Sequence, residues 1–276
     1  MTTAEERILT KTRVVLVTGA SRGIGRALGA ELARRGHRVY GAARTWPVPE
    51  GALPFETLEM DVTDDASVSA AVRRLLDSEG RIDTLVNNAG IGLSGPVEET
   101  PLARAQRVFD TNYFGTVRTI QAVLPAMRRQ GEGTVANVAS AAGKIGIPFQ
   151  SHYAASKFAV EGFTEALYHE LLPFRIRVLL IEPGDVRTSI WRQSEHVKPE
   201  GSPYATALGR FHAVKAREMG DAADPPDRTA RQIADILESD SRRLRHPVAG
   251  MAGLLLLARK LVPDSLFLWA VRRNYR

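Results

Sequence analysis

A tyrosine and a lysine four residues apart form the pair in this sequence that is best suited to proton transfer. Tyr153 and Lys157 lie in a segment, 151–172, whose pattern predicts a helix, and helical side chains at i and i+4 share one face. A neighbouring ammonium, together with a positively charged ring in a bound ligand, favours a phenolate, so we expect the pKa of Tyr153 to fall below its usual value of about 10. Such a phenol can donate a proton to a carbonyl or accept one from an alcohol. Taken alone, a helical Tyr–Lys pair is more often a surface contact.

A glycine-rich turn near the start of the chain could hold a diphosphate. Its three glycines lie between an apolar run, 14–17, that predicts a strand and a pattern, 27–35, that predicts a helix. Glycines permit a tight turn and a close backbone approach, and a helix start offers free N–H groups and a positive dipole end. A glycine turn that binds nothing is the alternative for this motif alone. The candidate residues are Gly19, Ser21, Arg22, Gly23, Ile24 and Gly25.

Four motifs, taken in order, resemble those of the short-chain dehydrogenase/reductase family. They are G-x-x-x-G-x-G over 19–25, Asn-Asn-Ala-Gly over 87–90, Tyr-x-x-x-Lys over 153–157 and Pro-Gly over 183–184. The resemblance covers about 13–189 and the last predicted strand, and it is greatest to the hydroxysteroid- and retinol-dehydrogenase-like branch. It implies an NAD(P)-dependent oxidoreductase that transfers hydride between the cofactor and a lipophilic ketone, aldehyde or secondary alcohol, with Tyr153 as general acid/base.

The resemblance also implies roles for single residues. Ser140 would hold the substrate oxygen, and Asn112 would support a water near Lys157. The four catalytic candidates are therefore Asn112, Ser140, Tyr153 and Lys157. Alone, Ser140 could be a turn residue and Asn112 a polar residue that interrupts a helix. Asp61 with Val62 would contact adenine, and Thr188 the carboxamide. The further cofactor-binding candidates are Asn88, Ala89, Gly90, Tyr153, Lys157, Pro183, Gly184 and Val186.

The end of the second predicted strand bears on the choice of cofactor. A carboxylate at this place usually binds the ribose hydroxyls of NAD, whereas this chain has Ala42, Ala43 and then Arg44. Arg44, with Arg22 in the glycine turn, could bind a 2′-phosphate through charge-assisted hydrogen bonds. We therefore expect NADP(H) to be preferred and NAD(H) to be possible, unless both arginines are solvated surface charges.

The substrate side is predicted from apolar residues. Regular patterns stop after Pro183 and resume near Asp227, so we expect an irregular lid over about 186–226. Its apolar residues favour a lipophilic carbonyl or alcohol substrate, although they could equally form the lid's own core. The candidate substrate-binding residues are Ser140, Ile145, Phe149, Tyr153 and Trp191.

Alternating strand and helix patterns predict an α/β fold: a three-layer α/β/α Rossmann-type, doubly wound domain with a mostly parallel sheet of about seven strands. We expect a flexible N-terminus (1–12), one NAD(P)-binding catalytic domain (13–250) and a C-terminal helical extension (251–276). The pattern predicts a long helical stretch over 102–129, in which Asn112 is the place where a break is possible.

Composition excludes several function classes. With no cysteine, the chain has no disulfide, thiolate nucleophile or thiolate metal site, and its six histidines lack metal-ligand spacing, so no metal is expected. The formal net charge is +6, but no dense basic run supports nucleic-acid binding. No signal segment precedes the first strand, and we expect a cytoplasmic protein.

The C-terminal segment reads as a pair of basic amphipathic helices broken at Pro263. We favour packing on the core or on a second subunit over peripheral membrane contact, and the family resemblance implies a homodimer or homotetramer. A non-catalytic nucleotide sensor or scaffold on the same fold is the main alternative function. A sugar-nucleotide epimerase would need a G-x-x-G-x-x-G turn, which this chain lacks.

Overall fold

The computed structural model describes residues 12–47, 49, 51–188, 190–220 and 223–275. The expected flexible N-terminus lies outside these residues except for Thr12. Within the described chain, seven strands form one parallel sheet in the order β3-β2-β1-β4-β6-β7-β9, and β5 pairs with β8 in a small second sheet. The strands are β1 (Val14–Thr18), β2 (Arg38–Ala43), β3 (Glu56–Glu59), β4 (Thr84–Asn87), β5 (Leu93–Ser94), β6 (Gly133–Val138), β7 (Ile176–Pro183), β8 (Glu195–His196) and β9 (Arg245–Val248).

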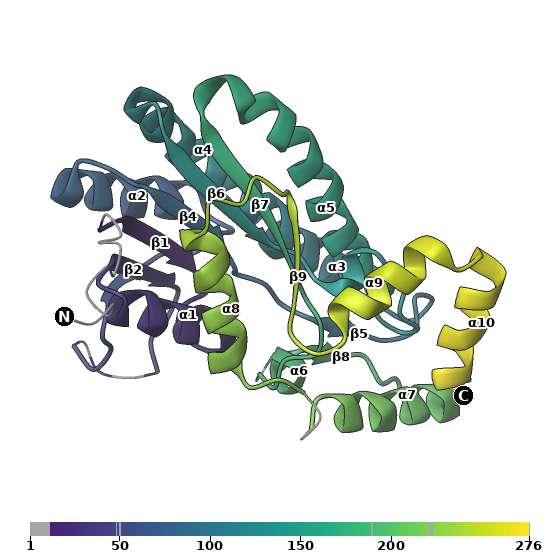
Figure 1. Cartoon of the computed structure of the whole chain (residues 1–276). Coiled ribbons are helices and arrows are strands. Elements are labelled where there is room, and N and C mark those ends of the chain that lie inside the picture. The colour runs from purple at the N-terminus through teal and green to yellow at the C-terminus, as the bar shows by residue number, and fades with distance from the viewer. Residues whose placement is uncertain (1–11, 48, 50, 189, 221–222, 276) are drawn as a thin grey trace, which may run out of the picture.

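Helices cover both faces of the large sheet (Figure 1). They are α1 (Gly23–Arg34), α2 (Asp65–Glu79), α3 (Leu102–Phe109), α4 (Gly115–Gln130), α5 (Ser151–Leu171), α6 (Ile190–Gln193), α7 (Ala205–Glu218), α8 (Pro226–Glu238), α9 (Ala252–Leu261) and α10 (Asp264–Asn274). Short turns are η1 (Asp110–Phe114), η2 (Ala141–Gly143) and η3 (Leu172–Phe174).

The two faces of the sheet have separate apolar cores. In β1, Val14 and Leu16 pack with residues of α2, α4 and α5, whereas Val15 and Val17 pack with residues of α1 and α8. Successive strand residues point to opposite faces, so a strand covered on both sides is a continuous apolar run. The predicted three-layer α/β fold is confirmed.

The helix 102–129 does not break at Asn112. Instead, the chain stays helical and widens into one π-helical turn, η1, between α3 and α4. Such turns interrupt the i→i−4 ladder and occur often at functional sites. The sequence signal was therefore real, but its structural outcome is a bulge rather than a break.

The segment after Pro183 is more ordered than expected. It contains α6, the strand β8 and the 14-residue helix α7, so the prediction of irregular structure up to Asp227 is wrong. The buried face of α7 consists of Leu208, Phe211 and Lys215. Their spacing of three and four residues is helical. Because the third buried residue is a lysine, a search for apolar periodicity in the sequence does not find this helix.

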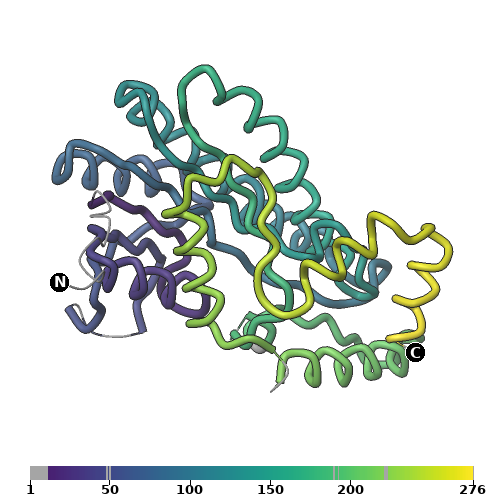
Figure 2. The backbone as a smooth tube through the Cα atoms, viewed as in Figure 1, coloured from purple at the N-terminus to yellow at the C-terminus, as the bar shows by residue number. Residues whose placement is uncertain are grey.

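The C-terminal residues form the expected helix pair, with Pro263 capping α10. Figure 2 shows this hairpin extending beyond the end of the sheet, at the opposite side of the molecule from the N-terminal strands. Among its described residues only Ala252 and Phe267 are buried. The expected packing on the core therefore applies to one face of the hairpin only.

Candidate active site

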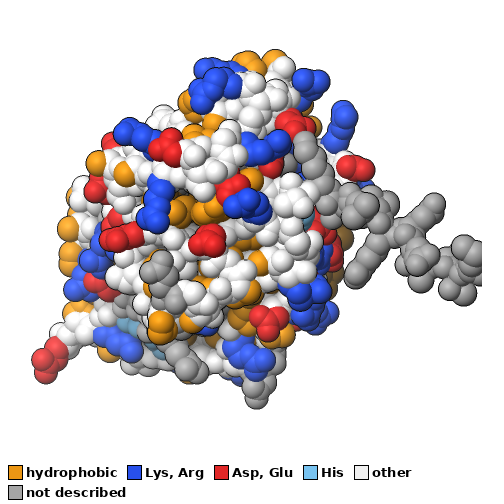
Figure 3. Space-filling view, turned by 90° about the vertical axis from the view of Figure 1, so that its left-hand side faces the viewer, with side chains coloured by type: hydrophobic (Ala, Val, Ile, Leu, Met, Phe, Trp, Pro, Cys, Tyr) orange, Lys and Arg blue, Asp and Glu red, His pale blue; other side chains and the backbone are white. Residues whose placement is uncertain are grey.

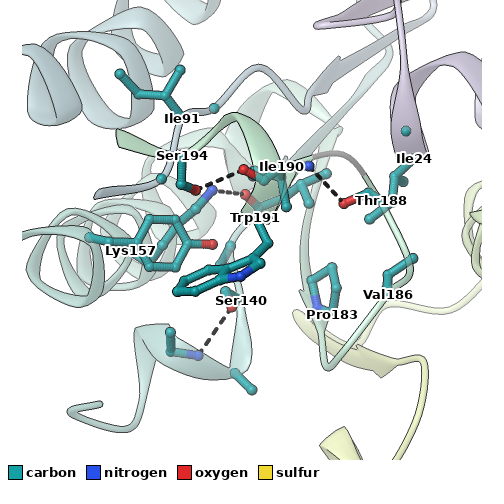
Figure 4. Close-up of a pocket in the computed structure, with 18 of the residues that line it drawn as sticks. Ile24, Ile91, Ser140, Lys157, Pro183, Val186, Thr188, Ile190, Trp191 and Ser194 are labelled. Carbon is teal, nitrogen blue, oxygen red and sulfur yellow. Dashed lines mark hydrogen bonds between the residues drawn. The ribbon is translucent and has the colours of Figure 1, made fainter. Parts of the chain in front are cut away.

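The predicted site residues converge on one cavity of about 650 Å³ at the carboxyl ends of the central strands. The strand order reverses between β1 and β4, and ligands of such sheets bind at that point. Every sequence-predicted site residue lines this cavity except Gly25, Asn112 and Phe149. Figure 4 shows the side of the pocket formed by Lys157, Ser140 and the segment from Pro183 to Ser194.

The backbone of the glycine turn can approach a bound ligand closely. Gly19 and Gly23 have φ angles of +66° and +56°, which other residues rarely adopt. Helix α1 then begins after Arg22 with no side-chain cap and no acidic residue in its first turn. Its first N–H groups and positive dipole end can therefore meet an anion.

Gly25 has a packing role instead of lining the cavity. A Cβ there would lie 2.4 Å from Asn88 Nδ2 and 2.5 Å from the Gly19 carbonyl oxygen. Asn88 Nδ2 donates to the carbonyls of Thr18 (2.9 Å) and Gly19 (3.2 Å). Thr18 Oγ1 in turn accepts from the backbone N–H groups of Asn88 and Ala89, both at 3.0 Å. The glycine turn and the Asn-Asn-Ala-Gly turn are thus one hydrogen-bonded unit.

Tyr153 and Ser140 line the same end of the cavity. Ser140 Oγ accepts from the Ala142 N–H (3.1 Å). Burial raises the pKa of Tyr153, and the neighbouring Ser140 hydroxyl opposes this rise only in part. In the protein alone the expected lowering by Lys157 is therefore wrong, because desolvation outweighs the neighbouring charges.

Lys157 lies at the base of the same site. Its Nζ donates to the Val138 carbonyl at the end of β6 (2.9 Å). Burial lowers the pKa of Lys157 to about 8, while the charge of Glu161 acts in the opposite direction. A buried ammonium with one fixed backbone acceptor keeps further N–H groups for other polar partners.

Asn112 is buried beside this site but does not line it. Its Oδ1 accepts from the Ile91 N–H (2.8 Å), and its Nδ2 donates to the Ile91 carbonyl and to Ser156 Oγ, both at 3.0 Å. A Cβ on Gly90 would lie 3.3 Å from Asn112 Oδ1 and 3.7 Å from Lys157 Nζ. The π-turn thus fixes the chain after β4 against α5.

The opposite end of the cavity is basic. Arg22 and Arg44 are both exposed there, and neither forms an ion pair with another residue that the structure describes. Asp61 is occupied locally: its Oδ1 accepts from the N–H (2.9 Å) and Oγ1 (2.8 Å) of Thr63. The carboxyl end of β2 itself carries Ala42 and Ala43 and no acid.

The substrate side is partly as expected. Figure 4 shows the Trp191 indole pointing into the pocket, on the side where Ser140 and Lys157 lie. Phe149, in contrast, packs on Phe211 with ring centroids 5.6 Å apart and lines a separate groove. Phe149, whose φ is +60°, is not among the residues that line the main cavity, so its assignment to this pocket is wrong.

Comparisons with known proteins agree with this geometry. The family model described as "short chain dehydrogenase" matches residues 13–198. The chain belongs to the short-chain dehydrogenase family. A 3-ketodihydrosphingosine reductase of Bacteroides thetaiotaomicron is 35% identical over 266 residues, covering 95% of this chain and 98% of that protein. Human 17-beta-hydroxysteroid dehydrogenase type 1 is 38% identical over 255 residues, with 84% and 76% covered.

Solved structures of short-chain dehydrogenases share the fold. One from Streptomyces avermitilis superposes with a TM-score of 0.79 at 33% identity, covering 96% of this chain and 99% of that one. One from Burkholderia phymatum, in complex with NAD, gives 0.77 at 25% identity, covering 94% and 96%. One from Burkholderia cenocepacia, in complex with NADP, gives 0.73 at 26% identity, covering 93% and 96%.

In this short-chain dehydrogenase, sequence reasoning missed a charged cluster in the cavity wall. Lys215 Nζ, on α7, lies 2.7 Å from Glu218 Oε2 and 3.4 Å from Asp185 Oδ1. Lys215 lowers and Asp185 raises the pKa of Tyr153, so both charges act on its phenol. No local pattern marks a lone lysine on an unexpected helix, and only the fold brings these residues to the site.

The C-terminal hairpin also contributes to the cavity wall, which the sequence did not predict. Met251, Leu255, Phe267 and Val271 line the cavity from α9 and α10 or the turn before them, and Tyr275 follows α10. Asn274 Nδ2 donates to Glu218 Oε1 (3.0 Å), which joins the hairpin to α7. The part of the cavity wall formed by α7 and the hairpin is therefore mostly apolar and includes one charged cluster.

Described residues include no group of acidic or histidine side chains that could hold a metal ion. In the same part of the chain, no helix is long and apolar enough to cross a membrane.

Proposed function

We propose that this protein is an NADP(H)-preferring oxidoreductase that reduces a lipophilic ketone, or oxidises the matching secondary alcohol, with Tyr153 as general acid/base. The observation that carries the proposal is that Tyr153, Ser140 and Lys157 line the same cavity as the glycine turn. When bound, the nicotinamide cofactor would supply or accept the hydride. The chain's own residues would supply the proton and fix the carbonyl.

The raised pKa of Tyr153 keeps the phenol protonated at neutral pH, which suits an acid that gives its proton to a reduced carbonyl oxygen. Ser140 can hold the same oxygen and then stabilise the phenolate by donating its hydroxyl proton. Lys157, with a pKa of about 8, is mostly protonated at pH 7 and would bind the cofactor's ribose. Asn112 would act by holding the chain at Ile91.

The residues of the basic end fit a phosphorylated cofactor. The uncapped start of α1 and the positive φ angles of the turn suit a diphosphate. Arg22 and Arg44, which form no ion pair with another residue that the structure describes, suit a further phosphate on the adenosine ribose. Asp61 and Val62 would contact adenine, and Thr188 the carboxamide.

For the substrate, we propose a long-chain ketone that carries a cationic group near its carbonyl. Most of the cavity wall is apolar, which suits an alkyl chain. The polar cluster sets two carboxylates, Asp185 and Glu218, against one ammonium, Lys215. Its net charge of −1 favours a substrate ammonium over a carboxylate. The similar protein from Bacteroides thetaiotaomicron is named for such an amino ketone.

The test of the oxidoreductase proposal compares wild type with Tyr153→Phe. Fluorescence titration should give NADPH binding in both proteins, because the ring remains. NADPH oxidation with lipophilic ketones should fall by about 10²–10⁴-fold in the variant, the usual contribution of a general acid. Wild type that binds NADPH but turns over no ketone would instead favour the nucleotide-sensing alternative.

The substrate proposal predicts a charge-selective effect of Asp185→Asn. The KM for a long-chain 2-amino ketone should rise about tenfold, because a charge-assisted contact is lost. The KM for the neutral ketone of equal chain length serves as the matched control and should not change. Equal effects on both ketones would contradict a role of Asp185 in recognising the ammonium.

A further inference from the structure

The C-terminal hairpin carries a cluster of exposed apolar side chains. Five of them, defined here as the hairpin patch, line neither the main cavity nor the neighbouring groove, and each is 52–71% exposed. The patch consists of Leu254, Leu257, Leu261, Leu266 and Trp269. Scattered exposed apolar residues are ordinary, but here five lie within sixteen consecutive residues of one hairpin.

The patch has the geometry of amphipathic helices. On α9, Leu254, Leu257 and Leu261 follow the spacing i, i+3, i+7 and so share one face. Leu266 and Trp269 are three apart on α10. The other face of the hairpin provides cavity-lining residues such as Leu255 and Phe267. The hairpin is thus a thin wall with the cavity on one side and the patch on the other.

Basic residues border the patch. Lys260, Arg272 and Arg273 are exposed, and the Arg273 guanidinium lies 5.3 Å from the centroid of the Trp269 ring. Asp264, the sole acidic residue between 252 and 275, already pairs with Arg259. Elsewhere the surface differs: on the face in Figure 3, acidic and basic side chains alternate and apolar side chains form only small patches.

We propose that the hairpin patch docks on the surface of an anionic lipid bilayer. The apolar side chains would enter the interface between headgroups and acyl chains, and the basic border would meet anionic headgroups. A second copy of this chain fits less well, because a two-fold interface would bring the same basic residues of both copies together. Helices of 10 and 11 residues are too short to span a bilayer and lie along it.

Docking in this way places the cavity next to the lipid. The wall formed by α9 and α10 would then separate bound substrate from the acyl region by one layer of helices. A lipophilic substrate could then reach the cavity without crossing water. Membrane docking would thus extend the proposed function, but the docking proposal does not depend on it.

The test is flotation of the full-length protein, without nucleotide, on phosphatidylcholine vesicles with and without about 30% phosphatidylglycerol. We expect binding to the anionic vesicles that weakens as salt is raised, since exposed charges are screened. The variant Leu257→Gln/Leu261→Gln/Trp269→Gln should lower the partition coefficient at least tenfold. Leu102→Gln is the matched control, because Leu102 is as exposed as Leu261 (71%) but lies outside the hairpin, and should bind as wild type does.

The basic border is tested separately by Arg272→Gln/Arg273→Gln. Each lost charge should weaken binding to anionic vesicles about fivefold, whereas Arg73→Gln/Arg74→Gln on α2 should have little effect. NADPH titration of each variant checks that the fold is intact. Wild type that stays unbound, or a triple variant that binds equally well, would overturn the proposal. Loss of an oligomer in the triple variant, with no vesicle binding by wild type, would assign the patch to a subunit interface and also overturn it.

Discussion

The choice between the two nicotinamide cofactors rests on single residues at the end of β2. Ala42 and Ala43 leave no carboxylate to bind the ribose hydroxyls or to repel a phosphate there. Arg22 and Arg44 approach the same end of the cavity from two different elements. Two guanidinium groups there suit a dianionic phosphate better than a neutral hydroxyl pair.

This arrangement predicts that Arg44→Asp reverses the cofactor preference. The Kd for NADPH should rise roughly tenfold to a hundredfold, because a charge-assisted contact is replaced by repulsion. The Kd for NADH should change little or fall. Fluorescence titration with both cofactors measures the ratio, and Arg73→Asp, the same charge change on exposed α2, is the control. An unchanged ratio of the two Kd values would refute the assignment.

At the scale of elements, the π-turn η1 connects two parts of the site. Through Asn112 it hydrogen-bonds both backbone groups of Ile91, which lines the cavity, and Ser156 on α5. Ser156 Oγ itself donates to the Tyr153 carbonyl (2.7 Å). The turn therefore sets the position of α5, and with it Tyr153, relative to the chain after β4.

The variant Asn112→Ala should lower both stability and turnover. It leaves the partly buried N–H and carbonyl of Ile91 without these partners, at a cost of about 1 kcal/mol, and it frees the chain beside Lys157. Thermal unfolding and NADPH oxidation measure the two effects. Thr116→Val is the matched control, since it removes only a hydroxyl that donates to the Asn112 carbonyl within the helix (3.0 Å). Turnover lost at an unchanged Tm would indicate that Asn112 relays protons directly.

The elements that sequence predicted well share one property. The cofactor side is built from turns that directly follow strands, such as the glycine turn after β1, so motif and position are adjacent in the chain. The substrate side depends on α7 and the hairpin, whose contacts with the cavity follow from long-range packing. For this reason Lys215 was not predicted as a residue of the cavity wall, and Phe149 was assigned to the wrong cavity. In the protein without cofactor, the pKa of Tyr153 is raised rather than lowered. The sequence could not predict this direction, because burial cannot be read from an i, i+4 pair.

At the scale of the whole molecule, a network of charges joins the end of the sheet to α5, the helix that carries Tyr153 and Lys157. Arg245 on β9 contacts Glu161 on α5 and Glu182 on β7, whose Oε1 lies 3.2 Å from Nη1. Both carboxylates are nearly inaccessible, with side chains 3% exposed. Glu161 is one turn from Lys157, and its negative charge opposes the lowering of the Lys157 pKa by burial. The network therefore links the packing of β7 and β9 to the charge of Lys157.

Glu182 should make stability depend on pH in a defined direction. Burial, together with Glu161, raises the pKa of Glu182 from 4.5 to about 7. Between these values the folded protein holds a proton that the unfolded chain releases, so stability falls as pH rises through this window. Glu182→Gln cannot ionise and removes this loss, and Glu161 still neutralises Arg245. The Tm of the variant should therefore exceed that of wild type by about 2–4 °C at pH 8 and by much less at pH 5.

Glu165→Gln is the control, because Glu165 binds the same guanidinium (2.8 Å) but is 58% exposed. This control variant should shift Tm little at either pH. A Glu182→Gln variant that loses stability equally at both pH values would show that the wild-type carboxylate is held ionised by Arg245.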